Sequence, residues 1–414
     1  MVAWSSLAKL VKCKALRIAL VALLALAVGG CPAPRSNSDI VCDPTGCMSL
    51  RKLTNNITNA LANNVTGYVA VVGDSIGGGL PLAGGLARTG VDGSTLGMGS
   101  RLLTQVASVS KLMTTIAVLK SLSAHNLTLD TKINGYIYPD WHRGPNIQAI
   151  TFRDLLSHRS GFNNSCGPTA YSDLKAQIQT GVPNATLIGQ PGNYCNGNFA
   201  IFREMLPVME GQSIPPDPSR AAWSAAFYVN YVNQHVFAPL QIPTRDCAPP
   251  PSGTDYILAY PLPAGTNHGV TLDNDGALQC GAGNWWLSGQ DLFKVVNDLA
   301  RGNVLLTATE KALMNGSTPT YIGWDNTVRT DCPAPNLCKN GSLDQSDNQL
   351  IKTVWGIATY AGIFKCVVPV VVIVNSTLPP PQPQSYNADL IPLVENAYNG
   401  ALTNDPPRPC PAGK

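Results

Sequence analysis

Charged residues are scarce in this chain of 414 residues, where Asp, Glu, Lys and Arg together make up 13% and the net charge is +3. After residue 17, Lys and Arg form no run that could cradle phosphates or read a nucleic-acid groove. We therefore expect no nucleic-acid partner. The shortage of charge does not indicate disorder, because 44% of the residues are hydrophobic, enough to bury one large core or two smaller ones.

Two further features are missing. The sequence contains no internal repeat, and its glycine-rich stretch, GDSIGGGLPLAGGLARTG at residues 73–90, lacks the Gly-Lys-Ser/Thr of a phosphate-binding loop. We therefore interpret this stretch as a hairpin connection and not as a nucleotide site.

The N-terminus has the pattern of a targeting segment. Basic residues precede the apolar run Ile18–Gly30, which is short for a membrane span and ends in small residues. Residues 1–30 are therefore predicted to be a signal peptide. The stretch VGGC, ending at Cys31, resembles a bacterial lipobox, which would make Cys31 the lipid attachment site and residues 31–46 a tether. An ordinary signal peptide cut nearby is the alternative. The protein would then be a periplasmic or cell-surface lipoprotein, or otherwise a secreted protein, with membrane contact only through the lipid.

The 12 cysteines fit an exported protein. With Cys13 removed in the signal peptide and Cys31 carrying lipid, ten remain, which could close five disulfides in an oxidising compartment. Other connectivities stay open. Sequence neighbours suggest the pairs Cys42–Cys47, Cys166–Cys195, Cys247–Cys280, Cys332–Cys338 and Cys366–Cys410.

The two ends of the chain carry strand and helix patterns, and the middle is mostly helical. Residues 50–61 show an amphipathic helix, residues 67–75 a buried strand, and residues 352–362 and 366–376 two adjacent strands, in which Pro369 suggests an edge or a bulge. A last helical pattern covers residues 388–402. We predict an α/β (α+β) fold with one sheet built from both termini and a mostly helical insertion.

Domain boundaries follow from this organisation. The globular domain is predicted over residues 47–402, with a short tail at 403–414. Its sheet part would comprise residues 47–125 and 290–402, and its helical part residues 126–289.

Candidate chemistry begins with Ser-x-x-Lys, which occurs four times. The matches starting at Ser6, Ser49 and Ser172 lie in the signal peptide, on the solvent-facing side of the first helix and in a polar stretch, as chance matches would. Ser108 and Lys111 instead begin a helix that is apolar nearly all round, which predicts burial. Burial would lower the lysine's proton affinity toward a value that accepts the serine proton. Alternatively, Ser108 caps the helix and Lys111 extends to water.

Two other motifs favour chemistry. Tyr194 and Asn196 form a Tyr-x-Asn before a helical pattern, although two further Tyr-x-Asn matches occur in a helix. Lys339 and Gly341, in CKNGS, form the one Lys-x-Gly of the chain, just before the C-terminal strands. Each motif is unspecific alone.

In this order the three motifs resemble those of the serine β-lactamase and penicillin-binding family, particularly class C β-lactamases with related D,D-peptidases and esterases. The connecting segments LTLDTKINGYIYPDW, ITFRDLLSHRSGF and GAGNWWLSGQDLFKVVNDLARG also look like the family's, so the resemblance spans about residues 65–402. It implies a β-lactamase-like fold, an antiparallel sheet flanked by helices, and an acyl-enzyme mechanism on a β-lactam or D-alanyl peptide. It implies no metal and no cofactor, and a small-molecule or peptidoglycan-like substrate.

The resemblance also implies roles for particular residues. Ser108 would be the nucleophile, and Lys111 and Tyr194 would share the acid and base work, with the phenol pushed toward phenolate by two ammonium groups. Asn196 would hydrogen-bond the substrate amide or Lys111. Lys339, next to Gly341, would pair with a substrate carboxylate or the tyrosine oxygen, and the N–H groups of Ser108 and Ser342 would form the oxyanion hole.

The chain departs from the family pattern at several positions. Asn340 replaces the usual Thr or Ser, Cys195 replaces a small residue, and a polar insert follows Ser342. His158 resembles a structural residue of the family. Two alternatives stay open: a short-chain esterase, and a penicillin-binding-type protein without turnover.

Overall fold

The computed structural model describes residues 39–162, 169–192, 194–272, 276–316, 321–332, 336–346, 353–378, 389–408 and 410. The predicted signal peptide, Cys31 and Cys166 lie outside these ranges. The described residues all belong to one compact unit, Asn37–Lys414. Within the described ranges, none of the helices is both long enough and apolar enough to cross a membrane.

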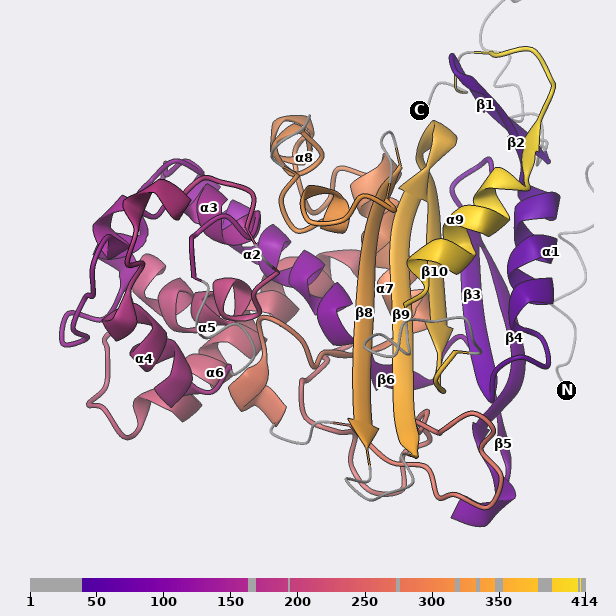
Figure 1. Cartoon of the computed structure of the whole chain (residues 1–414), viewed down its shortest axis with the longest axis horizontal. Coiled ribbons are helices and arrows are strands. Elements are labelled where there is room, and N and C mark those ends of the chain that lie inside the picture. The colour runs from indigo at the N-terminus through magenta and orange to yellow at the C-terminus, as the bar shows by residue number, and fades with distance from the viewer. Residues whose placement is uncertain are drawn as a thin grey trace, which may run out of the picture. The chain divides into compact units, whose positions relative to one another are not determined.

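A six-stranded antiparallel sheet forms the centre of this unit, in the order β5-β4-β3-β10-β9-β8 (Figure 1). Three of its strands come from the N-terminal part of the chain and three from the C-terminal part, with helices between them. This confirms the predicted fold class. The strands are β3 (Gly67–Gly73), β4 (Gly79–Arg88), β5 (Leu96–Gly97), β8 (Leu337–Ser346), β9 (Val354–Phe364) and β10 (Val368–Val374).

Helices cover both faces of the sheet. Val69 and Val71 of β3 pack into the same core as α2 and α7, whereas Ala70 and Val72 pack with α1 and α9. Successive side chains of a strand point to opposite faces, so a strand covered on both faces must be apolar throughout. The α-helices of the described residues are α1 (Leu50–Leu61), α2 (Ser110–Ala124), α3 (Phe152–Leu156), α4 (Tyr171–Thr180), α5 (Gly197–Met209), α6 (Arg220–Val232), α7 (Gly289–Arg301), α8 (Ala308–Met314) and α9 (Ile391–Asn399).

The first helix follows its sequence pattern closely. The four apolar residues at three-to-four spacing are all buried in α1. Ser49, however, is not on the solvent-facing side: it is buried and caps α1, accepting a hydrogen bond from Lys52 N at 3.1 Å and donating one to Asp39 at 2.9 Å. This Ser-x-x-Lys therefore has a capping role.

The glycine-rich stretch contains a hairpin connection, as predicted, but most of it is the second strand of that hairpin, β4. The connection is only the turn after β3, where the carboxylate of Asp74 accepts hydrogen bonds from Ile76 N and Gly78 N. β4 then pairs with β3 from Gly79 to Gly85. Gly84 has a steric reason to be glycine, because an added Cβ would lie 2.6 Å from the ring of Tyr68.

Pro369 also differs from its expectation. β10 lies between β3 and β9 and is not an edge strand. Pairing with β3 begins only at Val370, opposite Val72, so the missing N–H of Pro369 interrupts no hydrogen bond to β3. A proline is therefore tolerated at the start of a central strand.

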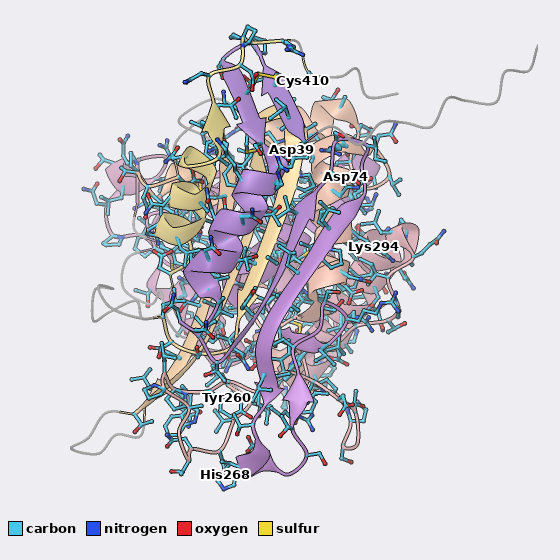
Figure 2. The ribbon with its side chains drawn as sticks, turned by 90° about the vertical axis from the view of Figure 1, so that its right-hand side faces the viewer. Asp39, Asp74, Tyr260, His268, Lys294 and Cys410 are labelled. Carbon is cyan, nitrogen blue, oxygen red and sulfur yellow. A yellow bond between two sulfur atoms is a disulfide. The ribbon has the colours of Figure 1, made fainter. Side chains whose placement is uncertain are left out.

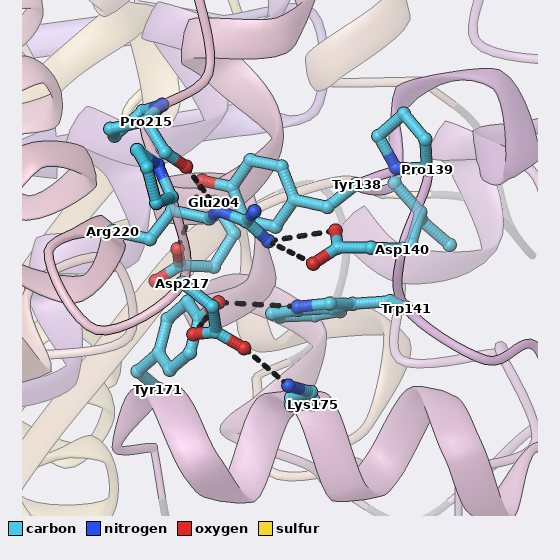
Figure 3. A network of polar contacts seen from close by, with 12 residues as sticks. Tyr138, Pro139, Asp140, Trp141, Tyr171, Lys175, Glu204, Pro215, Asp217 and Arg220 are labelled. Atoms are coloured by element: carbon cyan, nitrogen blue, oxygen red, sulfur yellow. Dashed lines mark hydrogen bonds and ion pairs between the residues drawn. The ribbon is translucent and has the colours of Figure 1, made fainter.

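The helical part lies beside the sheet (Figure 1), and a network of polar contacts joins its elements (Figure 3). Arg220 donates to both carboxylate oxygens of Asp140, at 2.8 and 3.0 Å. Asp217 accepts from Tyr171 at 3.0 Å and from Lys175 at 2.5 Å. These contacts join the starts of α4 and α6, and they explain Lys175 of the Ser172 motif as a structural residue.

Two small sheets and three disulfides complete the described structure. β1 and β2 form a hairpin that includes the last residues of the predicted tether, 40–46, and β11 pairs with β2 (Figure 2). The predicted disulfides Cys42–Cys47, Cys247–Cys280 and Cys332–Cys338 are confirmed. The other two predicted pairs each include a side chain outside the described set. The strands are β1 (Ile40–Asp43), β2 (Gly46–Ser49), β11 (Leu402–Thr403), β6 (Leu103–Gln105) and β7 (Trp286–Ser288).

Candidate active site

Ser108 lies half-buried in a short 3-10 turn directly before α2. The preceding residue, Ala107, has φ +47°, a left-handed conformation that is unfavourable for alanine. The turn is held on both sides of its start, because Val106 N donates to Trp285 O at 2.9 Å and Val106 O accepts from Thr359 Oγ1 at 2.8 Å. Backbone strain of this kind persists only where the surroundings impose it. Here the two hydrogen bonds of Val106 hold the turn and thereby fix the position of Ser108.

Lys111 is fully buried beneath Ser108. Its Nζ donates to Ser108 Oγ at 3.0 Å, to Asn196 Oδ1 at 2.9 Å and to Ala282 O at 2.6 Å. Burial, and then the positive charge of Lys339, hold the pKa of Lys111 well below its usual range. The amine is therefore neutral at a lower pH than an exposed lysine, as the sequence predicted.

Tyr194 and Asn196 come from the segment that enters α5, and they meet the other two motifs. The ring centre of Tyr194 lies 4.8 Å from Lys111 Nζ and 5.1 Å from Lys339 Nζ. The phenol also interacts with the side chains of Ser108 and Lys339. The structure thus brings together all three motifs that the sequence singled out.

The phenol of Tyr194 is not pushed toward phenolate. Burial of the hydroxyl raises its pKa, and the opposing charge of Lys339 does not compensate. The side chain as a whole is 37% exposed, so part of the ring faces the open side of the site. In the free protein Tyr194 is accordingly a protonated hydrogen-bond donor.

Lys339 is paired within the protein. It is buried on β8, and its Nζ lies 2.5 Å from Asp325 Oδ1 and 2.9 Å from Asn340 O. Burial alone would lower the pKa of Lys339, but the carboxylate of Asp325 and then Tyr194 raise it above its usual value. Lys339 is therefore a cation whose charge is already balanced.

Gly341 allows β8 to approach the nucleophile. A Cβ added there would lie 2.3 Å from Thr359 Oγ1, 2.7 Å from Val106 O and 3.0 Å from Ser108 N. Real Cβ atoms do not come so close to backbone atoms. Glycine is therefore required for the contact between β8 and the Ser108 turn.

The N–H of Ser342 points away from β9, to the outer edge of β8. β8 is the last strand of the sheet, and its N–H groups at Cys338 and Asn340 point away from β9, donating to Asn326 Oδ1 at 3.2 Å and Asp325 Oδ2 at 2.8 Å. Alternate N–H groups of a strand share a direction and the register of β8 and β9 is continuous here, so Ser342 N also points outward. This orientation suits the predicted oxyanion hole.

Asn340 points away from the site. Its Oδ1 accepts a hydrogen bond from Leu390 N at 3.2 Å, just before α9, on the opposite face of the sheet. Asn340, in place of the usual Thr or Ser, therefore stabilises the sheet from the face opposite the site.

His158 supports the Tyr194 segment. It is buried, its Nδ1 accepts from Cys195 N at 3.1 Å, and its ring centre lies 4.3 Å from that of Tyr194. Burial, and then the charges of Lys111 and Lys339, lower its pKa well below the usual value, so the ring is neutral. This agrees with its interpretation as a structural residue.

Two contributors to the site were not found in the sequence. Asp325 follows Trp324 in a short 3-10 turn (Asp325–Thr327) that covers the edge of β8, and a lone Asp there carries no pattern. Ala282 contributes its carbonyl oxygen, which no residue type reveals. Among the described residues, no three His, Cys, Asp or Glu side chains are grouped to hold a metal ion.

Several solved structures share the fold of this chain. A β-lactamase/D-alanine carboxypeptidase from Pseudomonas syringae superposes with a TM-score of 0.62 at 15% identity, covering 84% of this chain and 98% of that one. A class C β-lactamase from Rhodobacter sphaeroides gives 0.58 at 16%, covering 85% and 98%. The D-amino acid amidase from Ochrobactrum anthropi SV3 gives 0.58 at 16%, covering 84% and 98%. At these identities the likeness shows the fold.

The sequence itself was compared with curated proteins and with family models. No curated protein matches. The β-lactamase family model matches residues 65–336, well over half of the chain and including the Ser108 and Tyr194 motifs. The chain belongs to the β-lactamase family.

Proposed function

We propose that this protein is a serine hydrolase that forms an acyl-enzyme on Ser108 with a β-lactam or a D-alanyl peptide and releases it by hydrolysis. The observation that carries the proposal is the 3.0 Å contact between Lys111 Nζ and Ser108 Oγ, made by a buried lysine whose pKa is lowered. When Lys111 is neutral, its two N–H groups serve Asn196 Oδ1 and Ala282 O, and its lone pair accepts the hydrogen bond from the Ser108 hydroxyl. A hydroxyl beside such a base is an activated nucleophile.

The first half of the reaction follows from the contacts. Ser108 Oγ attacks the substrate carbonyl carbon and its proton passes to the neutral Lys111 Nζ. The carbonyl oxygen becomes an oxyanion that accepts hydrogen bonds from the N–H groups of Ser108 and Ser342. When the amide bond breaks, Tyr194 gives its proton to the leaving nitrogen and is reprotonated from Lys111.

The second half reverses these roles. Water attacks the acyl carbonyl and loses its proton to Lys111, directly or through Tyr194. Ser108 Oγ leaves and takes a proton back. Asn196 holds Lys111 through the 2.9 Å contact and keeps an amide N–H₂ for the substrate.

One observation favours a second candidate. Lys339 is paired with Asp325 at 2.5 Å, so it attracts a substrate carboxylate less than a lone cation would. The site then suits uncharged acyl groups as well, such as short-chain esters, which keeps an esterase as the alternative. The third candidate is a penicillin-binding-type protein in which Ser108 is acylated without turnover. The polar insert after Ser342 is the reason for keeping this candidate.

Export and lipid attachment at Cys31 belong to the same proposal. The three confirmed disulfides support an oxidising compartment, since disulfides are rare in the reducing cytosol. Mass spectrometry of the N-terminal peptide of the mature protein tests this: a diacylglycerol-modified Cys31 is expected, and an unmodified N-terminus at another residue would contradict lipid attachment.

The test of the catalytic proposal is intact mass measured minutes after addition of a chromogenic cephalosporin or, separately, a p-nitrophenyl ester. We expect an adduct or turnover that Ser108→Ala abolishes and that the matched variant Ser172→Ala, at the other Ser-x-x-Lys beside the helical core, leaves intact. Cephalosporin reactivity supports the β-lactamase or peptidase reading, and ester turnover alone supports the esterase. A persistent adduct indicates the non-turnover protein, and no reaction with either reagent refutes the catalytic proposal.

A further inference from the structure

The ammonium group of Lys339 has all of its donors in use within the protein. An ammonium group carries three N–H donors. In Lys339, Nζ lies 2.5 Å from Asp325 Oδ1 and 2.9 Å from the carbonyl oxygen of Asn340. The side chain also hydrogen-bonds with the phenol of Tyr194. A substrate group that enters the site therefore finds this cation already satisfied.

Asp325 is fixed in the position that faces Lys339. It begins the turn Asp325–Thr327, and its second carboxylate oxygen, Oδ2, accepts a hydrogen bond from Asn340 N at 2.8 Å. The side chains of Lys339 and Asp325 are 1% and 4% exposed. If Lys339 turned from Asp325 to a ligand, a buried carboxylate would be left without its partner, which is strongly unfavourable. The pair therefore stays intact and carries no net charge.

This neutral pair lies where the leaving group of the substrate would lie. In the proposed reaction Tyr194 gives its proton to the leaving atom, so the leaving group lies beside Tyr194. The ring centre of Tyr194 is 5.1 Å from Lys339 Nζ and 4.8 Å from Lys111 Nζ. Lys111 is the neutral base of that reaction, and the ring of His158 beside Tyr194 is neutral too. The charge that faces the leaving group is therefore set by Lys339 and Asp325, and it is zero.

A carboxylate on the leaving group is disfavoured at such a place. On entering the site it loses part of its hydration and meets neither a free ammonium donor nor an uncompensated positive charge. An uncharged group of the same shape, such as a carboxamide, loses much less free energy of hydration. The site therefore discriminates by charge and not by size.

From these contacts, and resting on the proposed function, we infer that Asp325 is a specificity-determining residue, which neutralises Lys339 and directs the site to acyl donors whose leaving group carries no carboxylate. Peptide amides and peptide esters belong to this class. Peptides that keep a free carboxylate beside the scissile bond would be poorer substrates. Asp325 acts through Lys339 and does not touch the reacting atoms.

The experiment compares two substrates that differ only in this charge, the esters of acetyl-D-alanine with glycolic acid and with glycolamide. kcat/KM is measured for the full mature protein, and we expect the wild-type protein to prefer the glycolamide ester about tenfold. Asp325→Asn leaves Lys339 unbalanced and should shift the ratio of the two kcat/KM values about tenfold toward the glycolate ester. Lys339→Gln leaves Asp325 unbalanced and should shift the ratio in the opposite direction.

Two controls separate charge from damage to the fold. The double variant Lys339→Gln/Asp325→Asn has no net charge at this place, so its ratio should return close to the wild-type value even where both rates are lower. Asp331→Asn, which removes a carboxylate from a more exposed ion pair with Arg329, should leave the ratio unchanged. A purely structural defect lowers both rates and does not move their ratio in opposite directions in the two single variants.

A wild-type preference for the glycolate ester overturns the inference while the chemistry of Ser108 stands. Single variants that leave the ratio unchanged, or shift it in the same direction, also overturn it. Calorimetric titration of Ser108→Ala with the two esters separates the inference from the proposed function, because it measures binding without turnover. Tighter binding of the glycolamide ester that added Asp325→Asn reverses supports the inference even if neither ester is turned over. Binding without this preference, or no binding of either ester, overturns it.

Discussion

At the scale of single residues, the neighbours of two buried lysines shift the pKa values of these lysines in opposite directions. Lys111 has a hydroxyl, an amide oxygen and a carbonyl oxygen around it, and its pKa is lowered by burial. Lys339 is equally buried but faces Asp325, and its pKa is raised. One carboxylate therefore decides which amine accepts a proton and which remains a cation.

Asp325→Asn tests this division. Asp325 raises the pKa of Lys111, so its removal should lower that pKa further and move the acid limb of the kcat/KM profile to lower pH. The variant should also lose about 3–5 kcal/mol of unfolding free energy, because Lys339 is left buried without its partner. A pH–rate profile and urea unfolding measure the two effects.

Asp331→Asn is the control, because it also removes one carboxylate, from a more exposed ion pair with Arg329. An acid limb that stays in place in Asp325→Asn, or moves equally in both variants, would argue against Lys111 as the base.

At the scale of elements, β8 contributes contacts from both of its faces and from its outer edge. Lys339 and Gly341 face the site, Asn340 reaches back to the residue before α9, and the outward N–H groups meet Asp325 and, by alternation, the oxyanion position. The period of two in a strand makes this division of work possible.

Gly341→Ala tests the approach of β8 to the nucleophile. The added Cβ would force apart β8 and the Ser108 turn, and we expect kcat/KM to fall about 100-fold, because displacements of this size remove catalytic alignment. Steady-state kinetics on the substrate that Ser108 turns over measures the loss. The control Gly97→Ala, also in a strand, meets no atom within 4 Å and should keep full activity.

Asn340→Thr tests whether the hydrogen bond from Leu390 N to Asn340 stabilises the sheet. The shorter side chain cannot reach Leu390 N, which would leave a buried N–H without its acceptor at a cost of about 1–3 kcal/mol. We expect a lower denaturant midpoint with kcat nearly unchanged. Asn230→Thr, at an exposed position of α6, is the control, and a large loss of kcat in Asn340→Thr would instead give this side chain a role in the site.

The sequence predicts some elements well and others poorly, for physical reasons. α1 could be predicted because its burial follows one periodic face, and Ser108 with Lys111 because a lysine in an all-apolar helix is anomalous. β4 could not, because its glycines accommodate neighbours distant in the chain or on the next strand: Phe293 at Gly79, the ring of Tyr68 at Gly84 and Thr66 O at Gly85. Asp325 and the carbonyl oxygen of Ala282 can be identified only from the folded structure, because neither belongs to a local sequence pattern.

At the scale of the whole molecule, the face of the sheet opposite the site holds a buried carboxyl group. Glu395 of α9 accepts from Asn336 at 3.1 Å and from Tyr360 at 3.4 Å. Burial raises the pKa of Glu395 to about 7. Because α9 also meets β8 through Asn340, the ionisation of Glu395 affects the packing of the layer that supports the site.

This raised pKa predicts how stability depends on pH. Glu395 ionises near 4.5 in the unfolded chain and near 7 in the folded one, so its contribution is fully present below pH 4.5 and is lost as the pH rises through about 7. The loss amounts to about 3 kcal/mol. Urea unfolding between pH 4.5 and 8 measures it.

Glu395→Gln isolates this contribution, because the neutral amide should remove the loss between pH 4.5 and 7. His158 and Lys111, whose pKa values are lowered, act in the opposite direction, so the difference between the wild-type protein and the variant is the quantity to compare. Parallel stability curves for the two proteins would show that Glu395 does not titrate in this range.

The disulfide Cys247–Cys280 has a consequence for how the family member can change over evolution. It ties together the two ends of the segment 247–280, and the carbonyl oxygen that holds Lys111 lies only two residues beyond its second cysteine. The disulfide therefore keeps both ends of this segment in place, whatever the length of the chain between them. The interior of the segment can therefore change in length or sequence, by evolution or by design, while its two ends stay beside the site.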